Sequence, residues 1–160
     1  MTDYPALVKT EQEPEYKKNP PLAVSSIGVE NTKKSTQMPD GSALLTGTGK
    51  NSSLKNQGIN YIIHAVPRPR SSSASDKEFI EIAAKAAQNS IILAEREGIK
   101  KLAICFIAGK IYRGSCDPLK LATAVVTGAL NQVAECQKLE EVAFVSLPEE
   151  YPEHSGIERC

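Results

Sequence analysis

The chain has 160 residues, which is enough for one domain of ordinary size and too few for two large ones. Apolar residues make up 41% of it and charged residues 24%, close to the proportions of soluble globular domains. Nineteen Lys and Arg residues balance nineteen Asp and Glu residues, and this zero net charge excludes binding to nucleic acid or to an anionic membrane by overall charge. No apolar run reaches the roughly 18 residues of a membrane span.

The cysteines and histidines are spread along the chain without a metal-binding pattern: Cys105, Cys116, Cys136, Cys160, His64 and His154. We therefore expect neither a metal site nor a cofactor. Cys105 lies in an apolar run and is predicted to be buried. Cys116 lies in a polar turn, where a non-catalytic role is expected before that of a catalytic thiol, because neither histidine is near in sequence. His64 is interpreted as an ordinary hydrogen-bonded residue of a strand. Residues 1–21 do not form a secretory signal, so the expected location is a cytoplasm, of the producing cell or of a host cell.

The first third of the chain gives weak structural signals. Residues 1–21 are rich in Glu, Lys and Pro and are interpreted as an irregular arm, so that the folded domain is predicted over residues 22–160. Short strands are predicted at 22–27 and 42–46. The stretch 47–58 has too many Gly, Ser and Asn residues for regular structure.

The next part of the chain gives sharper signals. Residues 59–66 form a β-branched apolar run that Pro67 ends, which predicts a buried strand. A long helix is predicted to begin after Ser75, because Glu78 three residues later completes a capping box. Gly98 is predicted to end this helix, since glycine readily adopts the left-handed conformation of a helix C-cap.

A second helix and two further strands follow. Residues 101–108 are typical of a strand buried on both faces, and Asp117-Pro118 is an N-cap with proline in the first helical position. Residues 142–147 form the last predicted strand. Apolar strands joined by long helices predict an α/β fold with a mostly parallel sheet and helices on both faces.

Such sheets bind ligands at the carboxyl ends of their strands, where the loops 67–75 and 109–116 are expected. The second loop combines two glycines with two basic residues, which are Gly109, Gly114, Lys110 and Arg113. It immediately precedes a helix N-terminus, where backbone N–H groups and the helix dipole favour an anion. The sequence therefore predicts an anion-binding site in this loop.

Four stretches, in this order, resemble the macro domain, an α/β module that binds ADP-ribose. Residues 38–43 (MPDGSA) with Thr46 resemble the family's P-x-G-x-A…T entry, and residues 61–66 (YIIHAV) resemble its IIHAV strand. Residues 108–113 (AGKIYR) stand where the family has the phosphate loop S-T-G-I-Y-G. Residues 142–147 (VAFVSL) resemble its last strand.

The resemblance covers residues 38–147 and implies a three-layer α/β/α fold with a mostly parallel central sheet. It implies binding of ADP-ribose or of an ADP-ribosylated protein, with hydrolysis of the ADP-ribosyl bond as a further activity of the family. The site residues that it implies are Ala108, Gly109, Lys110, Ile111, Tyr112, Arg113, Gly114, Ser25 and Leu147. In this arrangement the loop 108–114 holds the diphosphate, Tyr112 lies beside the distal ribose and Leu147 borders the adenine.

The chain departs from the family at the same site. No glycine-rich loop is visible among the 37 residues before Met38, and Ser25 stands where the family has an Asn associated with hydrolysis. Lys110 replaces a family glycine and Arg113 follows the tyrosine, so that a long side chain either fills the diphosphate channel or pairs with a phosphate. Binding is therefore expected before catalysis, and whether the protein is an enzyme stays open at this point.

The alternative is a macro-like scaffold that has lost the nucleotide site and binds protein or RNA. Between Val29 and Arg70, six basic residues stand against two acidic ones: Lys33, Lys34, Lys50, Lys55, Arg68 and Arg70 against Glu30 and Asp40. This patch is either a solvated loop surface or a weak, salt-sensitive contact for RNA.

Overall fold

The computed structural model describes residues 23–27, 38–49 and 52–145, with the backbone alone for 23–27. The elements, in order, are β1 (Ala23–Ile27), β2 (Ala43–Gly47), α2 (Ser53–Asn56), β3 (Tyr61–Ala65), α3 (Asp76–Arg96), β4 (Lys101–Cys105), α4 (Pro118–Val133) and β5 (Glu141–Val145). Two short 3-10 turns lie in loops, η1 (Arg70–Ser72) and η2 (Lys110–Tyr112). The predicted strands and both predicted helices are confirmed. The short helix α2 is an addition, in a stretch for which the sequence predicts irregular structure.

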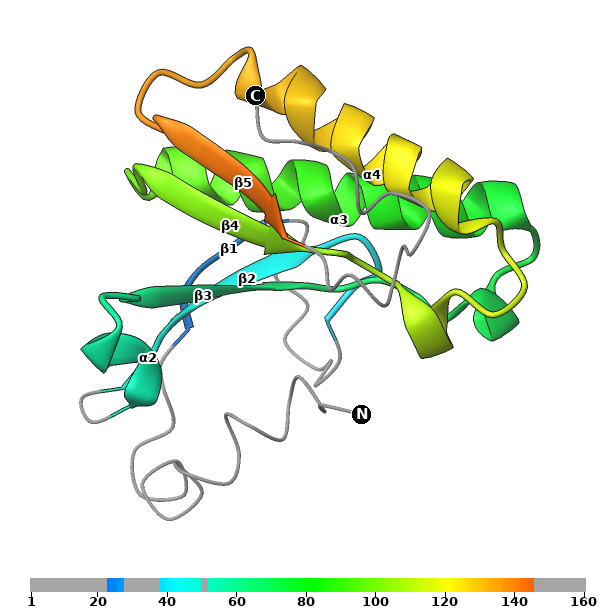
Figure 1. The fold of residues 1–160 in the computed structure, drawn as a ribbon, viewed down its shortest axis with the longest axis horizontal. Helices are drawn as coiled ribbons and strands as arrows, with labels where there is room; N and C mark the ends of the chain where they lie inside the picture. The colour runs from blue at the N-terminus through cyan, green and yellow to red at the C-terminus, as the bar shows by residue number, and fades with distance from the viewer. Residues whose placement is uncertain (1–22, 28–37, 50–51, 146–160) are drawn as a thin grey trace.

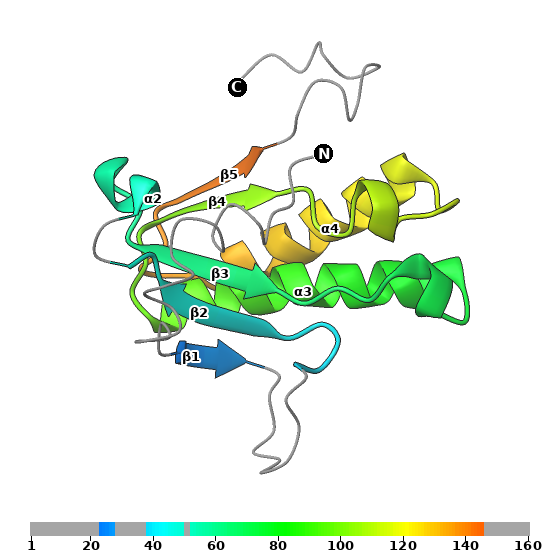
Figure 2. The same ribbon diagram turned by 90° about the horizontal axis from the view of Figure 1, so that it is seen from below.

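The strands form one antiparallel and one parallel ladder. β2 pairs antiparallel with both β1 and β3, and Leu45 of β2 lies opposite Ile63 of β3. β4 and β5 pair in parallel, with Leu102 opposite Val142. Figure 2 shows the strands side by side in the order β1 to β5. The described strands therefore form two separate sheets, a three-stranded antiparallel one and a two-stranded parallel one, and the predicted mostly parallel sheet is not what they form. β1, β2 and β3 are antiparallel because they follow one another without the crossover helix that parallel neighbours need.

Both long helices lie on the same face of the strands. α3 and α4 run side by side along that face in both views (Figures 1 and 2). α3 connects β3 of the three-stranded sheet to β4 of the two-stranded sheet, and α4 connects the parallel strands β4 and β5. The described residues thus form a mixed α/β structure of two layers, and the helical layer expected on the other face stays a prediction.

The ends of the helices follow the local sequence signals. The Ser75 hydroxyl accepts a hydrogen bond from the N–H of Glu78 at 3.1 Å, which confirms the capping box that begins α3. Gly98, with φ +69°, follows the end of this helix. Asp117 caps α4, since its carboxylate accepts hydrogen bonds from two N–H groups of the first turn.

The apolar face of α3 belongs to both clusters of buried side chains. The larger cluster joins α3 to α4 and β4, and its bulky members include Phe79, Ile91, Leu121, Val125 and Ile104. The smaller cluster packs Leu93 of α3 against Ala43 and Leu45 of β2. The two helices approach closely at Gly128, where a Cβ atom would lie 3.1 Å from the carbonyl oxygen of Ala84.

The strands bury one face more than the other. In β4 Ile104 is buried, whereas Ala103 and Cys105 point to the opposite face and are exposed. The predictions that β4 is buried on both faces and that Cys105 is buried are therefore wrong. Alanine and cysteine keep the run apolar in sequence even where they face outward, so the alternation that marks a half-exposed strand is hidden. β3 is likewise not buried throughout, because His64 is exposed.

A buried hydrogen bond joins α3 to the turn before β2. The Asn89 side-chain amide, 7% exposed, donates to the carbonyl oxygen of Gly41 at 2.7 Å. Asn89→Ala leaves that carbonyl without its donor, so we expect the free energy of unfolding, measured by urea denaturation, to fall by about 1–3 kcal/mol. The neighbouring exposed change Gln88→Ala should alter it by less than about 0.5 kcal/mol. Equal losses in the two variants would contradict this role of Asn89.

The carboxylate of Glu95 in α3 organises the loop before β5. It accepts hydrogen bonds from the N–H groups of Gln137, Lys138 and Leu139. Desolvation acts to raise the pKa of Glu95, but the hydrogen bonds outweigh it and hold the pKa below its ordinary value of 4.5.

A lowered pKa in the folded state means that Glu95 stabilises the protein above pH 4.5 and that this contribution is lost as the pH falls through the lowered pKa. In Glu95→Gln we expect lower stability at pH 7 and a smaller loss of stability between pH 6 and pH 3 than in the wild type. Urea midpoints across this range measure both effects. The exposed variant Glu81→Gln is the control, and a wild-type pH slope in Glu95→Gln would be the contrary result.

Candidate functional site

The loops that leave β3 and β4 meet at the carboxyl ends of these strands. The first carries η1 and the second carries η2. They touch where Gly114 faces Arg70, because a Cβ atom built on Gly114 would lie 3.6 Å from the Arg70 side chain. The two loops that the sequence predicts at one edge of the sheet are therefore neighbours in the structure.

The loop 108–114 has an unusual backbone. Ala108 and Lys110 have φ values of +61° and +51°, and Gly114 has +56°. Between the first two, Gly109 is extended, and a Cβ atom there would lie 2.3 Å from Cδ1 of Phe106. Glycine at 109 is thus required by the close approach of the Phe106 ring, not by its own dihedral angles.

The side chains of this loop divide into buried and exposed ones. Ala108 is 7% exposed and belongs to the larger core cluster. Ile111 and Tyr112 are 74% and 48% exposed. The loop is therefore anchored at its start and presents an apolar and an aromatic side chain to solvent at its tip.

Arg113 turns back on its own loop. Its guanidinium donates a hydrogen bond to the carbonyl oxygen of Cys116 at 2.6 Å, and the residue is half-buried. Asp117, the residue after Cys116, accepts hydrogen bonds from the N–H groups of Leu119 and Lys120. An anion bound at the start of α4 would use the same N–H groups. The helix N-terminus on which the sequence-based prediction of an anion site partly rests is therefore already capped by a carboxylate.

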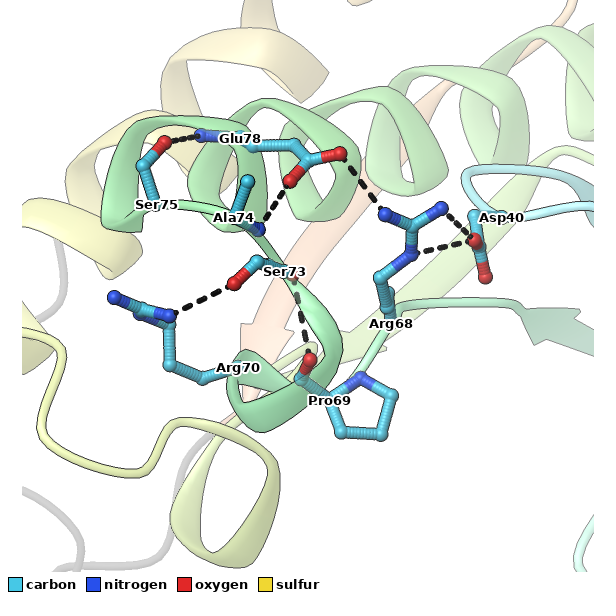
Figure 3. A network of polar contacts seen from close by, with 8 residues as sticks. All are labelled: Asp40, Arg68, Pro69, Arg70, Ser73, Ala74, Ser75 and Glu78. Carbon is cyan, nitrogen blue, oxygen red and sulfur yellow. Dashed lines mark hydrogen bonds and ion pairs between the residues drawn. The ribbon is translucent and has the colours of Figure 1, made fainter.

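The loop after β3 is held by ion pairs that Figure 3 shows in part. Arg68 lies between Asp40, at 2.6 Å, and Glu78, at 2.9 Å. The other oxygen of Glu78 accepts from the N–H of Ala74. Arg70 pairs with Asp76 and donates to the carbonyl oxygen of Ser73. These contacts link the turn before β2, the η1 loop and the start of α3.

The same ion pairs change the interpretation of the basic patch. Lys33, Lys34 and Lys50 lie outside the described residues. Of the patch residues that the structure describes, Arg68 and Arg70 pair with carboxylates, and the Lys55 ammonium donates to the side-chain oxygen of Asn60. The two arginines are thus locally neutralised, which weakens this part of the patch as a contact for RNA.

The remaining predicted site residues are not brought to the loop by the described structure. Ser25 lies in β1, where its backbone is paired with Leu45, and its side chain is not described. Leu147 lies outside the described residues. Their roles beside the distal ribose and the adenine stay predictions.

The surroundings of Cys116 and His64 indicate structural roles for both residues. Cys116 is 1% exposed, and burial, followed by the nearby Asp76 charge, raises the pKa of its thiol. A raised pKa keeps the sulfur protonated at neutral pH, the opposite of an activated nucleophile. The interpretation of His64 as a hydrogen-bonded strand residue is confirmed, because its Nε2 lies 2.8 Å from the Thr46 hydroxyl.

Other features of the described residues do not add to the site. No three His, Cys, Asp or Glu side chains there gather as metal ligands would, and no helix there is long and apolar enough to cross a bilayer. A shallow groove of about 660 Å³ lies between α3 and α4. Its lining residues are Ile80, Leu119, Lys120, Thr123, Ala124, Thr127, Gly128 and Asn131, none of which is a predicted site residue.

The sequence profile of the Macro domain matches residues 24–119. This match spans more than half of the chain and includes β1 through the start of α4. The chain belongs to the macro domain family. None of the curated proteins compared with it matches.

The fold is also similar to a solved structure, "Alphavirus P23pro-zbd". The two share a TM-score of 0.51 and 19% sequence identity over 68% of this macro domain protein. The aligned part is 14% of the alphavirus chain, so the present chain corresponds to a small part of that protein. At this identity the similarity concerns the fold alone.

Sequence reasoning missed the contacts that hold the loop after β3 in place. Arg68 was assigned only to a basic patch, although its partners Asp40 and Glu78 lie 28 and 10 positions away. The contact between Arg70 and Gly114 likewise depends on the arrangement of β3 and β4. The one usable signal was the pair of arginines directly after a strand end, followed by acidic residues at the start of a helix.

The glycine at the centre of the loop gives a test of its geometry. Because φ at Gly109 is −68°, alanine is allowed there and only the contact with Phe106 opposes it. We expect Gly109→Ala to lower the free energy of unfolding by about 1–3 kcal/mol, as overpacking does. Gly47→Ala, where no atom lies within 4 Å of the new Cβ, is the matched control. If both variants have wild-type urea midpoints, the close approach of Phe106 is not a constraint.

Proposed function

We propose that this macro domain protein binds ADP-ribose, free or attached to a protein, through the loop 108–114. The single observation that carries the proposal is that this loop, inside the stretch that matches the Macro domain, has left-handed backbone at residues 108, 110 and 114. The resemblance of residues 108–113 to the family's phosphate loop supports the same position. The loop also contains the turn η2, and backbone N–H groups in turn conformations are a known source of phosphate-binding sites. In this proposal the loop holds the diphosphate, Tyr112 lies beside the distal ribose, and Ser25 and Leu147 complete the site.

An ADP-ribosylated protein is part of the proposed ligand class because of the loop's tip. Ile111 and Tyr112 are exposed at the edge where the two loops meet. An apolar and an aromatic side chain there offer a surface to the protein that carries the modification. A cytoplasmic location, in the producing cell or in a host cell, belongs to the same proposal.

Hydrolysis of the ADP-ribosyl bond is a second, weaker proposal. It requires a group that orients a water molecule against the anomeric carbon. The position of the family's Asn holds Ser25, which is a smaller donor and acceptor. Incubation with an ADP-ribosylated protein and measurement of released ADP-ribose tests this activity separately from binding.

Isothermal titration calorimetry with ADP-ribose tests the binding proposal. We expect saturable heat with the wild type and with Gly47→Ala, and a loss of affinity of about tenfold or more in Gly109→Ala, because the displaced loop no longer presents its N–H groups. Circular dichroism establishes that both variants are folded at the temperature of the titration.

A different result would favour the alternative scaffold function. No heat and no thermal shift at millimolar ADP-ribose would remove the nucleotide proposal. A gel shift with RNA that disappears as the salt concentration rises would then support an RNA-binding scaffold. Within the described residues the paired arginines Arg68 and Arg70 speak against that scaffold, so we expect no such shift.

A further inference from the structure

The helix α4 exposes a surface that is almost free of charge. Of its 16 residues only Lys120 is charged. Two of its leucines are about half exposed, Leu119 at 55% and Leu130 at 51%. The exposed side of α3, by contrast, carries charged residues along its length: Asp76, Lys77, Glu81, Lys85 and Arg96. A helix surface with little charge and exposed leucines is typical of an interface and not of a face that stays in water.

The exposed leucines adjoin the groove between α3 and α4. Leu119 is one of the residues that line it. Positions 119 and 130 are about three helical turns apart, so Leu130 lies on the same side of α4 as Leu119. Small residues of α4 line the groove between these two positions: Thr123, Ala124, Thr127 and Gly128. Small side chains leave room for the larger side chains of another helix.

The α4 stripe, which consists of Leu119, Thr123, Thr127 and Leu130, has the same pattern in both directions. From either end, a leucine is followed by a threonine three or four positions further on. Two α4 helices that pack antiparallel, with residues 124 and 125 at the centre, therefore place Leu119 of one copy near Leu130 of the other and Thr123 near Thr127. Such a surface is complementary to itself, as the contact of a two-fold symmetric dimer has to be.

The single charge of the helix also fits an antiparallel pair. Lys120 of one copy then lies beside the last turn of α4 in the other copy. This turn holds no basic residue, and its carbonyl groups carry the negative end of the helix dipole. The two Lys120 ammonium groups lie at opposite ends of the contact, so they do not repel each other.

We propose that the α4 stripe, with the groove beside it, is the contact surface of a homodimer in which two copies of this chain pack α4 against α4 antiparallel around a two-fold axis. This inference goes beyond the proposed function and does not depend on it. A contact made by one helix face of each copy is smaller than a standard interface of about 1,600 Å², so we expect a weak dimer with a dissociation constant in the micromolar range.

Sedimentation velocity of the full chain over a range of protein concentrations tests the dimer. We expect the weight-average sedimentation coefficient of the wild type to rise with concentration. Leu119→Glu and Leu130→Lys each place a charge against a leucine of the other copy, so each should weaken the dimer about tenfold or more. Ile59→Glu makes an equivalent change at a side chain outside α4 that is 42% exposed, and it should leave the dimer unchanged.

The two leucine substitutions are chosen to keep the monomer folded. An acidic residue in the first turn of a helix and a basic residue in the last turn both interact favourably with the helix dipole. At a concentration where the wild type is monomeric, we therefore expect urea midpoints close to the wild type, with free energies of unfolding within about 0.5 kcal/mol.

A mixture of the two variants tests the antiparallel orientation. In a mixed dimer, one end of the contact joins the introduced carboxylate to the introduced ammonium group, and the other end keeps both leucines. We expect the mixture to dimerise about fivefold or more tightly than either variant alone. In a parallel pair position 119 would meet position 119, and mixing would give no gain.

Three results would overturn the proposal. The first is a wild type that stays monomeric up to about 1 mM. Unchanged urea midpoints in the leucine variants would then leave a different protein as the occupant of the stripe, and lowered midpoints would indicate a segment of the same chain. The second is a dimer that neither leucine substitution weakens, and the third is a mixture that dimerises no more tightly than the separate variants.

Discussion

The structure depends most on the packing of α3. This helix contributes to both clusters of buried side chains, with Phe79 and Ile91 in the larger one and Leu93 in the smaller one. Through the second cluster and the hydrogen bond from Asn89 to Gly41 it fixes the antiparallel strands, and through the first it fixes α4 and β4. The loops after β3 and β4 are brought together because both strands are held by this one helix. A change that loosened α3 would therefore disturb the proposed site without touching it.

The same packing explains why an anion site here has to depend on a loop. The start of α3 is occupied by the Ser75 hydroxyl and the Glu78 carboxylate, and the start of α4 by Asp117. Helix N-termini that are capped by the chain's own carboxylates repel a further anion instead of attracting it. What remains between the two helices is the loop 108–114, with its left-handed residues and its exposed lysine.

Much of the fold was predictable because the signals are local. The capping box of Ser75 and Glu78, the Asp117-Pro118 start and the glycine after α3 lie within a few residues of the ends that they define. The exposure of Cys105 was not predictable, since it depends on which face of β4 receives a helix and small apolar residues conceal the difference. For the site, the loop could be located by its glycines and basic residues. The hydrogen bond from Arg113 to the Cys116 carbonyl could not be predicted, because it depends on backbone dihedral angles that no residue type specifies.

The surroundings of the loop favour binding over hydrolysis. A general base needs a carboxylate or another acceptor that is accessible and basic enough to take a proton. Asp76 is paired with Arg70, and Glu78 with Arg68 and the Ala74 N–H. The hydrogen bond from the Lys120 N–H, with that from Leu119, lowers the pKa of Asp117, which makes this carboxylate a weaker base. The described carboxylates beside the loop thus serve to hold the backbone. Carboxylates that stabilise the backbone through ion pairs and hydrogen bonds suit a module that binds a ligand of fixed shape. Hydrolysis would require a water-orienting group from elsewhere in the chain.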